Sequence, residues 1–565
     1  MTHPGSTATT PQTPEPDDRA ALDGAGADAR WWREAVVYQV YVRSFADANG
    51  DGVGDLAGVR DRLPYLRDLG VDALWFNPWY PSPLADWGYD IADYRSIDAA
   101  FGTLEDAEQL IAEARALGIR TIVDIVPNHV SDQHPWFRSA LTSPAGSAER
   151  ERFWFRPGAG SDGELPPNGW QSIFGGPAWT RTDDAGVPGE WYLHLFAPEQ
   201  PDLNWTHADV WAEHEDVLRF WFDRGAAGVR IDSAALLVKD PHLAEEAPQH
   251  EAGEHPFTDR DELHDIYRRW RGIADGYREP RILVGEVWLP DPDRFARYLR
   301  PDELHTAFNF DFLACPWEPG PMRASIESAL AAHAPVDAPT TWVLSNHDVT
   351  RPVTRYGRTD TSFSFESRRA GTPTDLERGT RAARAAALLA MALPGSMYIY
   401  QGEELGLPEV EDLQDELLQD PMFFRSGGTD PGRDGCRVPI PWGGDERPFG
   451  FSPDGASAQP WLPQPAAWND YSAAAQESDP SSMLELYRAA LRQRRAEPAL
   501  GDGSLRWLDS PQEVLAFARG ERFVCVVNVS QRAVDLPAHE SVLIASGALA
   551  GGLLAPDTAI WLRVG

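Results

Sequence analysis

The chain has 565 residues, 42% of them hydrophobic, and carries a formal net charge of −37 at pH 7. This length predicts two to four domains rather than one small core. The negative charge disfavours nonspecific binding to nucleic acid or anionic lipid, so we expect a neutral or cationic substrate and no nucleic-acid partner.

Cysteine spacing and hydrophobic patterning restrict the class of protein further. Three cysteines, at positions 315, 436 and 525, lie too far apart to suggest a disulfide framework or a metal-binding CxxC pair. Residues 1–30 lack the basic start and apolar run of a signal peptide, and their composition predicts a disordered tail. No apolar run approaches the roughly 20 residues that span a bilayer. We therefore expect a soluble, cytoplasmic protein without a membrane partner.

From Trp31 onward, short apolar segments alternate with amphipathic helices. Helices are expected between the strands, for example over residues 56–70, 103–118, 214–225 and 261–273. Strands are predicted at 36–42, 73–77, 121–126, 228–232, 282–287, 306–310, 341–346 and 396–402. These strands are short and rich in β-branched residues, as strands buried on both faces are. Eight such units favour an α/β fold of the (β/α)8 TIM-barrel type over an open doubly wound sheet.

Three segments interrupt the alternation. Residues 130–207 follow the third strand, are rich in Pro, Gly and Trp, and are too long for a loop, which predicts an inserted subdomain. Residues 403–480 form a second irregular excursion, and alternating runs beyond residue 498 predict a C-terminal all-β domain, a β-sandwich over 498–565. The barrel is thus expected to comprise residues 31–129 and 208–497.

A loop rich in acidic residues follows the first predicted strand. Its start matches an EF-hand, but the twelfth position is Gly58, which has no side-chain ligand, so that interpretation fails. Two interpretations remain. The loop could be a solvated acidic turn. It could instead wrap one hard cation through the side chains or carbonyls of Asp47, Asn49, Asp51, Val53 and Asp55.

Polar residues end several predicted strands. The third strand contains Asp124 and runs on to His129, and the fifth ends at Glu286. The fourth ends in Arg230 and Asp232, and the seventh runs into Asn346, His347 and Asp348. Since active sites of such barrels form at the carboxyl ends of the strands, these side chains are expected at one mouth.

Carboxylates gathered in a cleft without a phosphate-binding loop suggest glycoside hydrolysis, with one carboxylate as nucleophile and another as general acid. The acid needs a raised pKa, whereas the nucleophile must stay ionised. Arg230 points to the same side of its strand as Asp232, and its charge should keep that carboxylate ionised. Asp124 is more typical of a residue that orders its neighbours than of one that reacts.

Five motifs resemble the signature regions of glycoside hydrolase family 13, the α-amylase family. They are DIVPNH (124–129), QPDLN (200–204), GVRID (228–232), GEVW (285–288) and SNHD (345–348). The resemblance extends from Trp31 to the C-terminal domain and implies a retaining mechanism. It makes Asp232 the nucleophile that forms a β-glucosyl-enzyme, Glu286 the acid and then base, and Asp348 the stabiliser of the transition state. His129, Arg230 and His347 would hold the glucosyl unit.

Two further segments, DWGYDIADY (86–94) and GRDGCRVPIPW (432–442), resemble the α-glucosidase and oligo-1,6-glucosidase branch of this family. In that branch an Asp and an Arg clasp the non-reducing glucose, which maps onto Asp86 and Arg437, with Tyr89 stacking on the sugar. The alternative is that Asp86 and Arg437 form a purely structural ion pair. Phe196 and Gln200 complete the expected substrate-binding set.

The same resemblance bears on specificity and on the acidic loop. The branch carries a structural calcium site just after the first strand, which favours the cation interpretation of residues 47–55. A closed pocket implies exo action on short oligosaccharides. In this branch a Val after the nucleophile accompanies α-1,6 specificity and smaller residues α-1,4, so Ser233 favours maltose-type α-1,4 bonds.

Three alternatives remain beside an α-1,4-glucosidase. An oligo-1,6-glucosidase would share the mechanism but not the linkage. A transglucosidase or isomerase similar to trehalose synthase would share the glucosyl-enzyme but pass glucose to a sugar hydroxyl. A non-enzymatic transporter subunit on the same scaffold is disfavoured, because the chain retains all three carboxylates and has no membrane segment.

Overall fold

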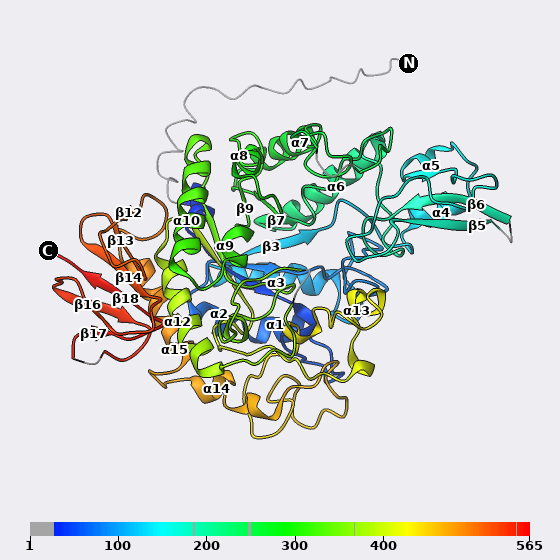
Figure 1. Ribbon diagram of the computed structural model, residues 1–565. Helices are drawn as coiled ribbons and strands as arrows, with labels where there is room; N and C mark the ends of the chain where they lie inside the picture. The colour runs from blue at the N-terminus through cyan, green and yellow to red at the C-terminus, as the bar shows by residue number, and fades with distance from the viewer. Residues whose placement is uncertain (1–27, 185–186, 247–249, 366–367, 550) are drawn as a thin grey trace, which may run out of the picture.

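The computed structural model describes residues 28–184, 187–246, 250–365, 368–549 and 551–565 (Figure 1). The disordered tail that we predicted for residues 1–30 falls almost wholly outside these ranges. Among the described residues, no helix is both long and apolar enough to cross a membrane.

The centre of the molecule is a parallel eight-stranded sheet in the order β10-β11-β1-β2-β3-β7-β8-β9. Its strands are β1 (Val36–Val40), β2 (Ala73–Phe76), β3 (Arg120–Ile125), β7 (Gly228–Ile231), β8 (Ile282–Gly285), β9 (Thr306–Ala307), β10 (Thr341–Val343) and β11 (Ser396–Tyr400). Side-chain hydroxyls of Thr306 and Thr341 hydrogen-bond across the remaining gap between β9 and β10. The sheet therefore closes almost completely, and the predicted (β/α)8 barrel is confirmed.

Helices cover the outside of the barrel. They include α1 (Leu56–Asp61), α2 (Leu63–Leu69), α3 (Leu104–Ala116), α6 (Ala208–Asp223), α7 (Leu263–Asp275), α8 (Pro292–Arg297), α10 (Pro319–His333) and α12 (Leu376–Ala392). The single helix predicted over residues 56–70 is wrong, because the chain breaks at Arg62 into α1 and α2. Pro64 explains the break, since proline fits the first turn of a new helix but not the interior of a continuous one.

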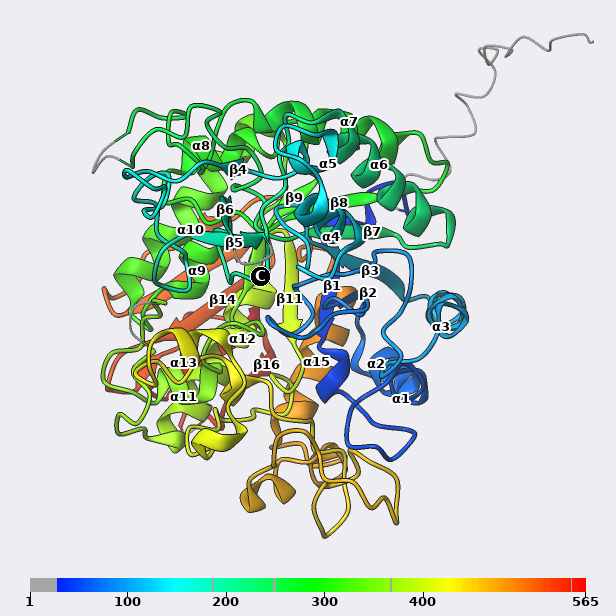
Figure 2. The same ribbon diagram turned by 90° about the vertical axis from the view of Figure 1, so that its right-hand side faces the viewer.

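An inserted subdomain separates β3 from α6, as predicted. It contains α4 (Pro135–Thr142), α5 (Ala148–Glu151) and an antiparallel sheet of β4 (Phe155–Arg156), β6 (Val187–Leu193) and β5 (Trp179–Asp184). Three buried tryptophans, at positions 154, 170 and 179, form its small core. The subdomain lies on the same side of the barrel as α13 (Pro421–Arg425), and this side faces the viewer in Figure 2.

The chain ends in the all-β domain that the sequence predicted. It follows α15 (Met483–Ala496) and holds a five-stranded antiparallel sheet, in the order β12 (Arg506–Trp507), β13 (Val514–Arg519), β14 (Phe523–Asn528), β18 (Thr558–Arg563) and β16 (Ser541–Ala545). A second sheet pairs β15 (Val534–Asp535) with β17 (Leu553–Leu554). Trp561 donates its indole N–H to the Leu388 carbonyl of α12 at 3.1 Å, which fixes this domain to the barrel. The domain lies opposite the inserted subdomain (Figure 1).

Candidate active site

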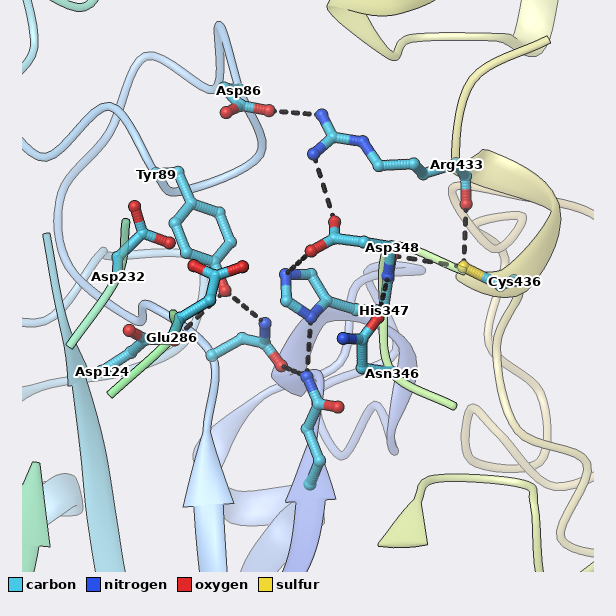
Figure 3. Close-up of polar contacts among 12 residues, drawn as sticks. Asp86, Tyr89, Asp124, Asp232, Glu286, Asn346, His347, Asp348, Arg433 and Cys436 are labelled. Atoms are coloured by element: carbon cyan, nitrogen blue, oxygen red, sulfur yellow. Dashed lines mark hydrogen bonds and ion pairs between the residues drawn. The ribbon is translucent and has the colours of Figure 1, made fainter. Parts of the chain in front are cut away.

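A cavity of about 630 Å³ opens where the carboxyl ends of the barrel strands meet the inserted subdomain. Its lining includes Asp86, Tyr89, His129, Phe196, Asp232, Ser233, Glu286, Trp288, His347, Asp348 and Arg433. The structure thus brings together most residues that we predicted for the site. Figure 3 shows the carboxylates and their partners around Tyr89 and His347.

The buried guanidinium of Arg230 organises one wall of this cavity. One of its nitrogens, Nη1, lies 2.9 Å from Asp124 Oδ1 and 2.7 Å from Asp232 Oδ1. The other, Nη2, lies 2.7 Å from Glu286 Oε2. Because β3, β7 and β8 are neighbours in the sheet, one side chain on β7 can hold the carboxylates that lie at or just after their carboxyl ends.

The pKa values of two carboxyl groups in the cavity are raised to different extents. Burial raises the pKa of Asp232 to about 6, although the charge of Arg230 opposes this. Burial raises the pKa of Glu286 to about 7, with the negative charges of Asp232 and Asp348 adding to the effect. Between these two values Asp232 is mainly ionised while Glu286 keeps its proton, the division of roles that a nucleophile and a general acid require.

Asp124 lies beneath the cavity and does not line it. Its Oδ2 accepts hydrogen bonds from Trp75 Nε1 at 3.2 Å and from the Tyr89 hydroxyl at 3.1 Å. Together with its bond to Arg230, these contacts give Asp124 the ordering role that the sequence suggested.

Asp348 lies on the opposite wall among cationic side chains. Its Oδ1 is 3.0 Å from Arg437 Nη2 and 3.2 Å from Arg433 Nη1. Burial opposes ionisation, but the interactions of Asp348 with His347, Arg433 and Arg437 outweigh it and hold the pKa of Asp348 well below its usual range. His347 lies 3.3 Å from Asp348 through Nε2, and its ring stacks on Tyr89 with 5.3 Å between centroids. Asp348 therefore stays ionised at any working pH.

We predicted that Asp86 and Arg437 bind the terminal glucose together, but the arginine that lines the cavity beside Asp86 is Arg433. Arg433 Nη2 lies 2.6 Å from Asp86 Oδ1, and both residues line the cavity (Figure 3). Arg437 is fully buried behind it and donates to the His347 carbonyl at 2.8 Å. A short 3-10 turn, Asp434–Cys436, separates the two arginines and directs them to different partners.

His129 and Gln200 support the Asp86 side of the cavity. The Gln200 amide nitrogen lies 3.2 Å from Asp86 Oδ2 and 3.0 Å from His129 Nε2. Gln200 itself is fully buried, so its role here is to hold Asp86 and His129 rather than to form the cavity surface. Phe196 packs against the His129 ring at 5.0 Å.

Aromatic residues that the sequence reasoning missed form another part of the wall. Trp288 stacks on Phe310 with 3.7 Å between ring centroids and donates its indole N–H to Glu286 Oε1 at 3.2 Å. The spacing of two residues between Glu286 and Trp288 in an extended segment was a usable signal, because it places both on one side. Phe174 comes from the inserted subdomain, where no sequence pattern marks it.

The acidic loop lies before α1, away from the cavity, and its side chains bond mainly to its own backbone. Asp47 accepts from the N–H groups of Gly50 and Gly52, at 2.6 and 2.9 Å. Asp55 accepts from the Ala48 N–H and from the Gly58 N–H, where it caps α1. Within the described parts of the chain, no three His, Cys, Asp or Glu side chains group in a way that could hold a metal ion. A calcium ion here would thus rely on the Asn49 amide and on backbone carbonyls as well as on carboxylates.

Comparisons with known proteins agree with this geometry. Residues 39–503 match the model of the α-amylase catalytic domain. A probable α-glucosidase from Rhizobium meliloti is 37% identical, covering 90% of this chain and 92% of that protein. An oligo-1,6-glucosidase from Heyndrickxia coagulans is 32% identical, covering 89% and 93%.

Solved structures give the same result. An α-glucosyl transfer enzyme, XgtA, has a TM-score of 0.81 at 34% identity, covering 95% of this chain and 99% of the other. The trehalulose synthase MutB from Pseudomonas mesoacidophila has a TM-score of 0.83 at 31% identity, covering 95% and 100%. The chain is therefore a glycoside hydrolase of family 13, the α-amylase family, and belongs to its branch of α-glucosidases and oligo-1,6-glucosidases.

Proposed function

We propose that this enzyme is an exo-acting, retaining α-glucosidase that releases glucose from the non-reducing end of short α-glucosides. The observation that carries this proposal is the ion pair of Asp86 and Arg433, which joins two distant chain segments at the cavity wall. A cavity closed in this way accepts the end of a sugar chain but not its middle. Both side chains also offer hydrogen bonds to the hydroxyls of a terminal glucose.

In the proposed reaction, a carboxylate oxygen of Asp232 attacks the anomeric carbon while Glu286 gives its proton to the departing glycosidic oxygen. The bond between carbon and leaving oxygen breaks, and a β-glucosyl ester of Asp232 forms. Glu286, now ionised, then takes a proton from water, whose oxygen attacks the same carbon and frees Asp232. Asp348 keeps its negative charge throughout and can bind sugar hydroxyls and stabilise the positive charge that develops on the ring.

For the linkage, we propose a preference for maltose-type α-1,4 bonds. Ser233 lines the cavity directly after the proposed nucleophile, and its small side chain leaves room beside the anomeric carbon. The relatives named as oligo-1,6-glucosidases make the α-1,6 linkage the direct alternative.

Glucosyl transfer is the second candidate, and the aromatic wall favours it. Trp288 stacks on Phe310, and Phe365 packs on Trp288 at 4.9 Å. Such a wall restricts water and offers a flat surface for an acceptor sugar. XgtA, a structural neighbour named as an α-glucosyl transfer enzyme, adds to this case.

One experiment separates these candidates. Purified enzyme is incubated in parallel with maltose, isomaltose, sucrose and trehalose, and products are separated by chromatography over time. We expect maltose to be cleaved fastest, with two glucose molecules formed for each one consumed. Faster cleavage of isomaltose would reassign the linkage, and new disaccharides formed without matching free glucose would establish transfer.

We also propose that the acidic loop binds a structural calcium ion through oxygens of Asp47, Asn49, Asp51, Val53 and Asp55. All five positions supply the hard oxygen ligands that calcium prefers. The loop connects distant segments, since the Asp47 N–H donates to Phe451 and the Trp461 N–H donates to Gly52. An ion that fixes the loop would stabilise these connections without taking part in the reaction.

A further inference from the structure

Ser233 has an unusual backbone conformation. Its φ angle is +48°, in the left-handed region that residues other than glycine rarely adopt. Such a conformation persists only where surrounding contacts hold it, and it often marks a functional position. In Ser233 this conformation directs two hydrogen-bond donors of the same residue toward two different carboxyl groups.

The first donor is the side chain and the second is the backbone. The Ser233 hydroxyl donates to Asp232 Oδ2 at 2.9 Å. The Ser233 N–H donates to Glu286 Oε2 at 3.0 Å. Each of the two carboxyl groups therefore touches Ser233 as well as Arg230.

Each oxygen of the Asp232 and Glu286 carboxyl groups has its own set of hydrogen-bond donors. Asp232 Oδ1 accepts from Arg230 at 2.7 Å, which leaves Oδ2 to the Ser233 hydroxyl. Glu286 Oε2 accepts from both Arg230 and the Ser233 N–H. Among the residues that the structure describes, Oε1 accepts only from the Trp288 indole N–H, at 3.2 Å. The acidic proton of Glu286 is therefore best carried on Oε1.

From this geometry we infer that Ser233 is a positioning residue, whose hydroxyl holds Asp232 ionised and in one orientation while its N–H fixes Glu286. The inference rests on the roles proposed above for Asp232 and Glu286. It goes beyond side-chain size at position 233, because it assigns a function to the hydroxyl group itself.

The hydroxyl acts in both halves of the proposed reaction. Before attack it stabilises the charged carboxylate, since a hydrogen bond to an ionised acceptor is stronger than one to a neutral acceptor. When water cleaves the glucosyl ester, the bonding electron pair returns to Asp232 and the proton of water passes to Glu286. The Ser233 hydroxyl then stabilises the returning negative charge.

The pH dependence follows from the groups that face Asp232. They are Arg230 on the preceding strand, Asp124 on β3, Glu286 just after β8, and Tyr89 and Tyr94 after β2. Asp348 lines the same cavity. Burial raises the pKa of Asp232, and the hydrogen bond from Ser233 lowers it. Loss of the hydroxyl alone leaves all the other groups in place, so the pKa of Asp232 should rise.

The test compares Ser233→Thr with Ser233→Val, which have the same shape but differ in the hydroxyl. Both β-branched side chains meet the same backbone strain, so strain cancels in the comparison. The rate with p-nitrophenyl α-glucoside is measured from pH 4 to pH 8. We expect the acid limb of kcat/KM to lie about one pH unit higher in S233V than in S233T, and kcat to be about tenfold lower.

Identical pH profiles and rates for S233T and S233V would overturn the inference. If either variant fails to fold, as judged by thermal melting, S233A is compared with the unchanged enzyme instead. An acid limb at the same pH in both proteins would then overturn the inference. Failure of the proposed function has a different signature. In that case the unchanged enzyme releases no glucose from α-glucosides, or Asp232→Asn retains its activity.

Discussion

Lys239, the only lysine of the chain, forms a fully buried ion pair with Asp202, with 2.7 Å between Nζ and Oδ2. The same ammonium donates to Asn128 Oδ1 at 2.5 Å and to the Leu236 carbonyl at 2.8 Å. Asp202 belongs to the inserted subdomain, Asn128 follows β3, and Leu236 follows the proposed nucleophile. One compact cation with three donors thus joins the subdomain to the barrel beside the active site.

Replacement of Lys239 by Met should destabilise the protein by about 3–5 kcal/mol, because it leaves Asp202 charged, buried and unpaired. Asp202→Asn in the same chain removes that charge, so the double variant should recover much of the loss. Denaturant unfolding of both variants measures this. Equal destabilisation of K239M and K239M/D202N would show that packing, and not the ion pair, matters here.

The pH dependence of kcat/KM should be bell-shaped and narrow. Activity requires Asp232 ionised, so it should rise as pH increases through about 6. It also requires Glu286 protonated, so it should fall as pH increases through about 7. Glu286→Gln should abolish the alkaline limb when the substrate has a good leaving group, since such a group departs without a proton. An alkaline limb that survives in E286Q would assign the acid to another residue.

Removal of either partner of the Asp86–Arg433 pair should weaken binding of the terminal glucose. A hydrogen bond between a charged group and a sugar hydroxyl contributes about 1.5–3 kcal/mol, so kcat/KM should fall roughly tenfold to more than a hundredfold, mainly through KM. Arg433→Ala and Asp86→Ala test this in steady-state kinetics. Arg433 also contacts Asp348, so Arg433→Ala should lower kcat in addition to raising KM. Arg437→Ala should act mainly on kcat, because Arg437 contacts Asp348 and does not line the cavity.

Arg358 provides the matched control for these arginine variants. It is equally buried and pairs with Glu411 outside the cavity. Arg358→Ala should lower the thermal midpoint while KM stays unchanged. A KM increase in R358A as large as that in R433A would mean that general loosening, and not lost glucose contacts, explains the effect.

Chelation tests the calcium proposal directly. We expect EDTA followed by dialysis to lower the thermal midpoint, and added calcium to restore it, because a bound ion stabilises the folded state by mass action. The Asp51→Asn variant should show a smaller calcium response. A thermal midpoint that changes with neither chelator nor calcium would mean that the loop is an acidic turn held by its own hydrogen bonds.

The sequence predicted the barrel well because buried parallel strands leave a strong apolar signal. Six of the eight predicted strands overlap the observed strands over most of their length, and the seventh, expected over 341–346, overlaps over half of it. The sixth, expected over 306–310, contains only Thr306 and Ala307. Asn309 ends it by capping the helix that begins at Phe310. Asn is a common capping residue at the start of a helix, but the apolar residues around Asn309 also fit a strand. The sequence therefore did not show where this strand ends.

The site could be predicted only in part, for a physical reason. Motif residues on strand ends were located because the barrel fixes where strand ends go. Arg433 and Arg437 lie four residues apart in an irregular segment, and nothing in the sequence tells which of them reaches Asp86. Contacts between loops depend on tertiary packing, which local patterns do not encode.

The most direct test of the proposed mechanism is the anomeric form of the glucose first released from p-nitrophenyl α-glucoside, whose leaving group contributes no glucose of its own. Proton NMR during the first minutes of reaction, before mutarotation, measures it. A retaining enzyme with Asp232 as nucleophile must release α-glucose first, and Asp232→Asn must release almost none. Initial β-glucose would contradict the covalent intermediate and the role of Asp232 together.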